Sequence, residues 1–231
     1  MKPEARDLGI DLHAGLDRLL DDDFETVCAR THELPFGGMS VRVLAPEDHL
    51  RILCLHLLQH GAWRPLWLCD VAIAVEARPP DFNWDRCLGS NRRRADWVAC
   101  GIGLASELLG ARVADTPVER RAASLPRWLV RRVQKQWNVP VSKRRGSSKH
   151  RAPMASYLGN PVRALMDLHT RWPDPIAATL SLGGPLNDWP RVFFQIANCI
   201  LRAEKFFRTE LRSAAARCNE PAYDKLAADK N

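Results

Sequence analysis

The sequence predicts a mainly α-helical protein with a small N-terminal β-sheet, which places it in the α+β class. Helical spacing of apolar residues begins at Pro46 and recurs through most of the chain that follows. Strand-like alternation is confined to two earlier stretches, residues 8–16 and 34–44. The 231 residues are 46% hydrophobic and 26% charged, a composition typical of globular proteins with a sizeable core.

The first strand is predicted at residues 8–16, where apolar residues alternate with polar ones. The apolar residues are Ile10, Leu12 and Ala14. A strand therefore places Asp11 and His13 together on one face. A short helix is predicted at 21–33, opened by three aspartates.

A β-hairpin is predicted at residues 34–44. Gly37-Gly38 supplies the turn, and Val41 and Val43 alternate with polar residues. We expect residues 10–14 and 40–44 to lie in one sheet of two or three short strands.

The stretch from residue 45 to residue 74 organises the helical part. Pro46-Glu47-Asp48 opens a helix at 47–60, because proline suits the first turn and acids suit the positive end of the helix dipole. Its predicted core face consists of Leu50, Leu53, Cys54, Leu57 and Leu58. Gly61 ends this helix and Pro65 begins the next, at 65–77, so the short turn predicts an antiparallel pair.

These two helices carry the candidate polar cluster. Its histidines share one stripe beside the core face; they are His49, His56 and His60. Asp70 lies within an apolar stripe of the second helix made of Leu66, Ile73 and Ala77, where a carboxylate is costly to bury unless it is paired. A fold-back near Trp63 predicts that His56 contacts Asp70 and that both are largely buried. A structural pair and a substrate or metal site both stay open, although His-x3-His has no third ligand in sequence.

The remaining helices are predicted at 84–89, 93–109, 117–123, 126–137, 154–170, 174–181 and 188–216. Gly110 caps the second of them. Their tryptophans are interpreted as core anchors or helix-end packing; these are Trp84, Trp97, Trp128, Trp137, Trp172 and Trp189. The predicted domains are 1–45, a helical domain at 46–141, a basic linker at 142–153, C-terminal helices at 154–218, and a frayed tail at 219–231.

The net charge of +7 favours anionic partners, although a solvated basic surface is the preferred explanation. The seven cysteines show no CxxC pair and are interpreted as reduced thiols of a cytoplasmic protein; they are Cys28, Cys54, Cys69, Cys87, Cys100, Cys199 and Cys218. We expect no membrane association, since no apolar run is long enough to span a bilayer and the first residues lack an apolar signal region.

Four motifs carry a resemblance to a known family. IDLH, PEDHL, CLHxxxH and WLCD follow one another between Ile10 and Ala111, and their order and spacing resemble the uncharacterised nucleotidyltransferase family. That family is similar to the polymerase-beta-type nucleotidyltransferases. The resemblance implies a partial nucleotidyltransferase core in residues 1–45, followed by a helical bundle.

The resemblance also implies a chemistry. In such enzymes three carboxylates hold two divalent metals, Mg²⁺ or Mn²⁺, for nucleotidyl transfer from a nucleoside triphosphate to an acceptor. Asp11 in IDLH matches the third carboxylate, as a catalytic metal ligand. His13, His56, His60 and Asp70 would position phosphate or support that site.

The sequence departs from the family pattern at its N-terminal end. It contains no Gly-Ser or Lys-Gly element followed by an Asp-x-Asp strand. We therefore expect a truncated core, with the missing half on a separate chain, lost through a misplaced start codon, or genuinely lost. This chain is then inactive alone.

Two other functions stay open. A non-catalytic helical module would bind a protein supplying the missing strands, or a nucleic acid through a basic face. A mononuclear metal hydrolase built on the histidine stripe is the least favoured, because no ligand set with an open position is recognisable.

Overall fold

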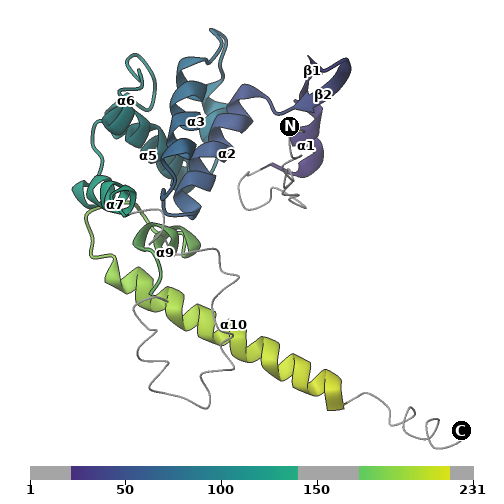
Figure 1. The fold of residues 1–231 in the computed structure, drawn as a ribbon, viewed down its shortest axis with the longest axis vertical. Coiled ribbons are helices and arrows are strands. Elements are labelled where there is room, and N and C mark those ends of the chain that lie inside the picture. Colours follow the sequence, from purple (N-terminus) through teal and green to yellow (C-terminus); the bar gives the residue numbers. More distant parts are fainter. Residues whose placement is uncertain (1–21, 140–171, 219–231) are drawn as a thin grey trace, which may run out of the picture. The chain divides into compact units, whose positions relative to one another are not determined.

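The computed structural model describes residues 22–139 and 172–218, with side chains as far as residue 209 except Phe206 (Figure 1). The chain divides into two compact units. The first comprises Met1–Arg144 and Pro185–Asp188, and the second comprises Arg145–Gly184 and Trp189–Asn231. The predicted strand at 8–16, the linker at 142–153, the helix at 154–170 and the tail at 219–231 lie outside the described residues.

The first unit begins with a short helix and a hairpin. Helix α1, Phe24–Ala29, is capped by Asp23, whose carboxylate accepts a hydrogen bond from the Thr26 N–H at 2.7 Å. Strand β1, His32–Phe36, pairs antiparallel with β2, Met39–Val43. Gly37 and Gly38, which form the turn between β1 and β2, both have a positive φ, and glycine adopts this conformation without strain. The hairpin prediction is confirmed, and the helix is shorter than predicted because β1 already begins at residue 32.

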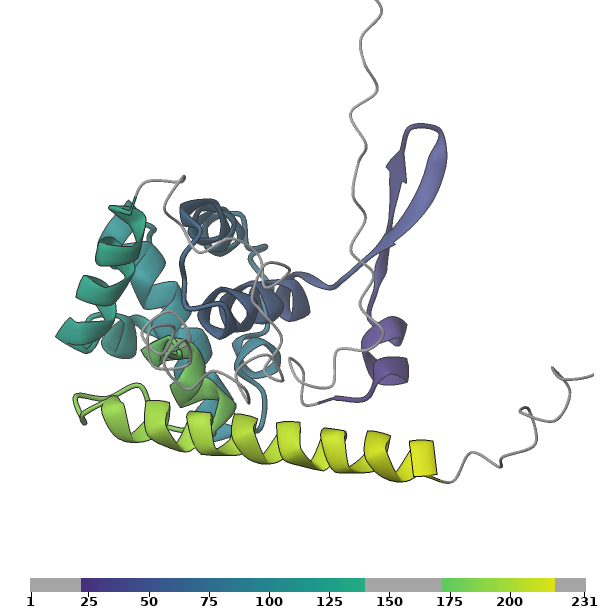
Figure 2. The ribbon, with the colours of Figure 1, turned by 60° about the horizontal axis from the view of Figure 1, so that its bottom comes forward.

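The hairpin projects from the helices of its unit and is exposed on both faces (Figure 2). Its register pairs Leu34 with Val41 and Phe36 with Met39, so these four apolar side chains share one face. Phe36 and Met39 are 73% and 68% exposed. A two-stranded hairpin is marginal by itself. Its apolar face is therefore left uncovered by the described residues.

Four helices form the core of the first unit: α2 (Pro46–Gln59), α3 (Pro65–Glu76), α4 (Trp84–Leu88) and α5 (Arg92–Leu109). Helix α5 packs against the other three. The approach of α5 to α2 is close at Gly101, where an added Cβ would lie 2.9 Å from the Cβ of Cys54. Gly110 ends α5 in the left-handed conformation, as predicted. The predicted core face of α2 is buried except at Leu53, which is half-buried.

Helix α3 buries a different face from the one that the sequence predicted. Leu66 and Ile73 are 69% and 65% exposed, whereas the buried residues are Leu68, Val71 and Val75. The helix is apolar around most of its circumference, so hydrophobic spacing did not distinguish its two faces. Asp70, which shares the stripe of Leu66 and Ile73, is consequently half-buried and has no need of a buried partner.

Helices α6 (Glu119–Ala122) and α7 (Arg127–Trp137) complete the first unit. Two hydrogen bonds join them to the segment Pro185–Asp188: the Trp128 indole donates to the Asn187 carbonyl at 2.6 Å, and Arg121 donates to the Leu186 carbonyl at 2.7 Å. Arg121 also forms an ion pair with Asp96 of α5 at 2.6 Å. The indole of Trp128 thus acts as a packing anchor, as the sequence predicted.

The second unit contains α9 (Pro175–Ser181), packed on α10 (Val192–Cys218). The Gln195 amide donates to the Pro173 carbonyl at 2.8 Å and holds the segment before α9 against α10. Helix α10 begins four residues later than predicted, because Pro190 disfavours a helical conformation at the residue before it. That residue, Trp189, is 70% exposed, so of its two interpretations, core anchor or helix-end packing, the first is wrong.

Six cysteines with described side chains are free thiols, in agreement with the prediction. Burial raises the pKa of Cys87 and of Cys100 to about 12, and raises that of Cys54 well above its ordinary value. Alkylation requires the thiolate and access to it. We therefore expect iodoacetamide at pH 8 to spare these three cysteines until the protein unfolds. Mass spectrometry would contradict this if they reacted in the folded protein as fast as the half-exposed Cys69.

Candidate functional site

The predicted site residues separate into three groups. Asp11 and His13 lie outside the described residues. His49 is exposed near the start of α2, about two helical turns from His56 and three from His60. His56 and His60 lie together at the end of α2, with ring centroids 4.5 Å apart. The histidine stripe therefore contributes one close pair.

The predicted contact between His56 and Asp70 is wrong. The His56 ring lies against Trp67, with centroids 4.8 Å apart, and no hydrogen bond or ion pair joins His56 to Asp70 in the part of the chain that the structure describes. The turn between the helices is centred on Gly61 and Ala62, both with positive φ, rather than on Trp63. When the centre of the turn shifts by one or two residues, the residue of α3 that lies opposite a given residue of α2 shifts by about three. That shift is nearly one helical turn.

An aromatic cluster instead surrounds the α2–α3 turn. Trp67 contacts His60 at 5.2 Å and Trp63 at 5.6 Å between ring centroids. The guanidinium of Arg64 lies over both indoles, 4.6 Å from the Trp63 centroid and 5.1 Å from the Trp67 centroid. The two tryptophans are half-buried and Arg64 is exposed. The sequence interpretation missed this cluster, although two tryptophans four residues apart around an arginine were a visible signal.

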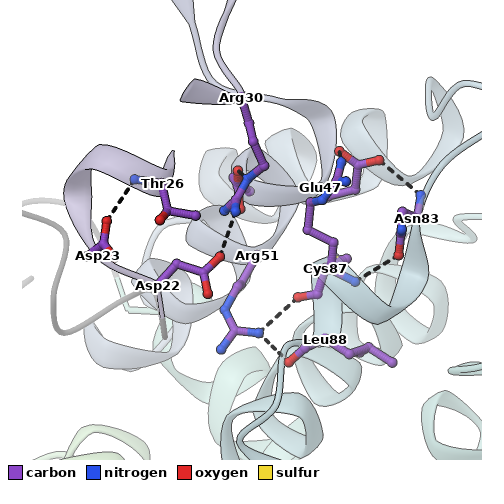
Figure 3. A network of polar contacts seen from close by, with 11 residues as sticks. Asp22, Asp23, Thr26, Arg30, Glu47, Arg51, Asn83, Cys87 and Leu88 are labelled. Atoms are coloured by element: carbon purple, nitrogen blue, oxygen red, sulfur yellow. Dashed lines mark hydrogen bonds and ion pairs between the residues drawn. The ribbon is translucent and has the colours of Figure 1, made fainter. Parts of the chain in front are cut away.

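A second polar group, at the start of α2, was also missed (Figure 3). Asp48 is 2% exposed and accepts two hydrogen bonds from Arg30, at 3.0 and 2.9 Å. Arg30 also forms an ion pair with Asp22 at 2.7 Å. Bidentate arginine–carboxylate pairs are strong and fix orientation. This pair therefore joins α1, and with it the hairpin, to the helical core.

Glu47 and Arg51 join α2 to α4 and the loop before it. The Glu47 carboxylate accepts a hydrogen bond from the Asn83 N–H at 3.0 Å. Arg51 is 1% exposed and donates to the carbonyls of Cys87 and Leu88 at the end of α4. Cationic groups stabilise helix C-termini. Besides favouring the start of α2, the two acids of the PEDHL motif therefore link it to its neighbours: Asp48 to the end of α1 and Glu47 to the start of α4.

A pH-dependent contribution to stability follows from Glu47. Burial alone would raise its pKa, but the Asn83 hydrogen bond and the Arg86 guanidinium outweigh burial and hold the pKa below the ordinary value of 4.5. Glu47 therefore stabilises the fold above about pH 4.5, and this contribution disappears as the pH falls through its lower folded-state pKa. We expect the difference in unfolding free energy between the wild type and Glu47→Gln to shrink as the pH falls from 7 to 3. A difference that is independent of pH would contradict this.

The described residues contain no group of three or more histidine, cysteine, aspartate or glutamate side chains that could hold a metal ion. None of the described helices combines the length and apolarity required to cross a membrane. The geometry therefore assigns two features to this part of the chain: a buried ionic junction at the start of α2 and an aromatic cluster at its end.

The helices and the two-stranded hairpin make this an α+β protein, and the described residues leave the apolar face of the hairpin uncovered. Residues 1–110 match the model of a family described as an uncharacterised nucleotidyltransferase. The matched range contains all four motifs and includes the hairpin, the ionic junction, the aromatic cluster and α5. The resemblance noted from the motifs is thereby confirmed. Neither the curated proteins nor the solved structures gave a match to the chain.

Proposed function

We propose that this chain supplies the helical part, and one catalytic carboxylate, of an enzyme that transfers a nucleotidyl group from a nucleoside triphosphate to an acceptor. The observation that carries the proposal is the family match over residues 1–110, in which IDLH, PEDHL, CLHxxxH and WLCD occur in order. In this proposal Asp11 is the catalytic residue and binds Mg²⁺ or Mn²⁺.

In this proposal the helical part positions the hairpin, to which the rest of the nucleotidyltransferase core would attach. The hairpin presents an apolar face, and the Arg30–Asp48 pair fixes its attachment to α2. Further strands of a nucleotidyltransferase core would cover that face and bring their carboxylates beside this unit. Divalent metals stabilise the leaving pyrophosphate in this class of reaction. His56 and His60 are assigned a supporting role from the α2 side.

The test is pyrophosphate release in the presence of magnesium or manganese. We expect no turnover by the 231-residue chain, because one carboxylate does not make a two-metal site. Addition of a segment with an Asp-x-Asp strand, on the same or on a separate chain, is expected to give turnover. Failure of every such combination, with the added segment shown to bind, would count against transfer activity.

The exposed hairpin also favours a second function, that of a non-catalytic module which binds a protein partner. Exposed apolar strands pair readily with other chains. In this case Phe36→Ser with Met39→Ser would abolish partner binding, and no completed complex would release pyrophosphate. The two functions thus give opposite results in the same assay. Sizing is a further check, since we expect the isolated wild-type chain to self-associate and the double variant to be monomeric.

A further inference from the structure

The α2–α3 turn presents two indole rings and a cation at the surface of the first unit. Trp63 and Trp67 are half-buried, with interplanar angle 72°, and the exposed Arg64 lies over both. A guanidinium is planar and weakly hydrated, so it stacks on aromatic faces. Its position marks a place over each indole that a planar group occupies.

The turn is held in place by α7. The Gln136 amide donates to the Gly61 carbonyl and the Trp137 indole donates to the Ala62 carbonyl, each at 2.9 Å. Ala62 has φ of 55°, a conformation that is unfavourable for a residue with a Cβ. These two bonds therefore fix a strained turn, and the rings that follow it are pre-positioned.

Exposed cations lie on the turn itself and on the helix that binds it. Arg64 itself is exposed, and Lys135 is exposed on α7 directly before the two residues that bind the turn. Arg131 is exposed one turn earlier on the same helix. Aromatic faces flanked by exposed cations are the arrangement by which proteins bind unpaired bases and the phosphates that connect them.

We propose that this cluster binds single-stranded nucleic acid. Unpaired bases stack on Trp63 and Trp67 in place of the Arg64 guanidinium, and the displaced Arg64, together with Lys135, contacts the connecting phosphates. A free mononucleotide offers the same base and phosphate chemistry but spans only one ring, so it binds more weakly. This inference stands independently of nucleotidyl transfer, since it concerns binding by the chain as it is.

The experiment measures the binding of a fluorescein-labelled 12-nucleotide oligo(dT) to the full chain by fluorescence anisotropy at 50–200 mM salt. We expect Trp63→Ala with Trp67→Ala to weaken binding about tenfold or more, without changing the salt dependence. Lys135→Ala should reduce the slope of log Kd against log salt by about one. Trp189→Ala is the matched control, since Trp189 is 70% exposed in the other unit, and it should leave Kd unchanged.

Thermal unfolding of each variant checks that it folds, and Trp63→Leu, which keeps an apolar side chain at the turn, replaces the double variant if that one does not. The proposal is overturned if oligo(dT) fails to bind at 50 mM salt. It is also overturned if the tryptophan variants bind as tightly as the wild type, or if dTMP or a duplex of equal length competes as well as the single strand. Weakening by Trp63→Leu but not by Trp189→Ala supports it.

Discussion

Replacement of Asp48 by alanine is expected to destabilise the protein by about 3 kcal/mol, because it removes the buried carboxylate that accepts two hydrogen bonds from the largely buried Arg30 guanidinium. Asp48 is 2% exposed and accepts both hydrogen bonds of the Arg30 fork. Arg30 would keep its contact with Asp22, which is largely exposed and offers less stabilisation. Urea unfolding followed by circular dichroism measures the loss.

Asp81→Ala is the matched control, since Asp81 is an exposed aspartate in the same unit and its loss should change stability by no more than about 0.5 kcal/mol. A loss caused by the ion pair should also be reduced in the Asp48→Leu/Arg30→Met double variant, where neither charge remains. Equal midpoints for Asp48→Ala and Asp81→Ala would show that the junction between α1 and α2 contributes nothing.

The second large effect concerns catalysis. In a protein completed with an Asp-x-Asp strand, Asp11→Asn is expected to abolish transfer, because asparagine keeps the shape of the side chain but removes the charge that binds a divalent metal. Loss of a metal ligand should lower kcat by several orders of magnitude, far beyond the effect of any change in stability. Asp7→Asn, four residues earlier, tests whether charge in this region matters in general.

Much of the fold could be predicted, because its signals are local. Gly37-Gly38 with alternating valines predicted the hairpin, and Pro46, Gly61 and Pro65 predicted the limits of α2 and α3 to within two residues. Helix caps and turns depend on a few neighbouring residues and are therefore readable from one sequence.

The candidate site was predicted less well, because its contacts join distant parts of the chain. Glu47 and Asp48 carried the signature of a helix start, and nothing in the sequence showed that Arg30 and Asn83 would meet them. The choice of face on α3 failed for a related reason: its apolar residues surround the helix, so only packing against α2 and α5 decided which ones are buried. The error in the turn centre then assigned His56 to the wrong partner.

The most direct test of the central claim, that residues 1–110 form part of a nucleotidyltransferase, is pyrophosphate release by the completed protein with magnesium or manganese. The account predicts turnover for the wild type and for Asp7→Asn, no turnover for Asp11→Asn, and none for the 231-residue chain alone. Turnover by the 231-residue chain alone, or by the completed protein that carries Asp11→Asn, would contradict it, because the reaction would then depend on other residues.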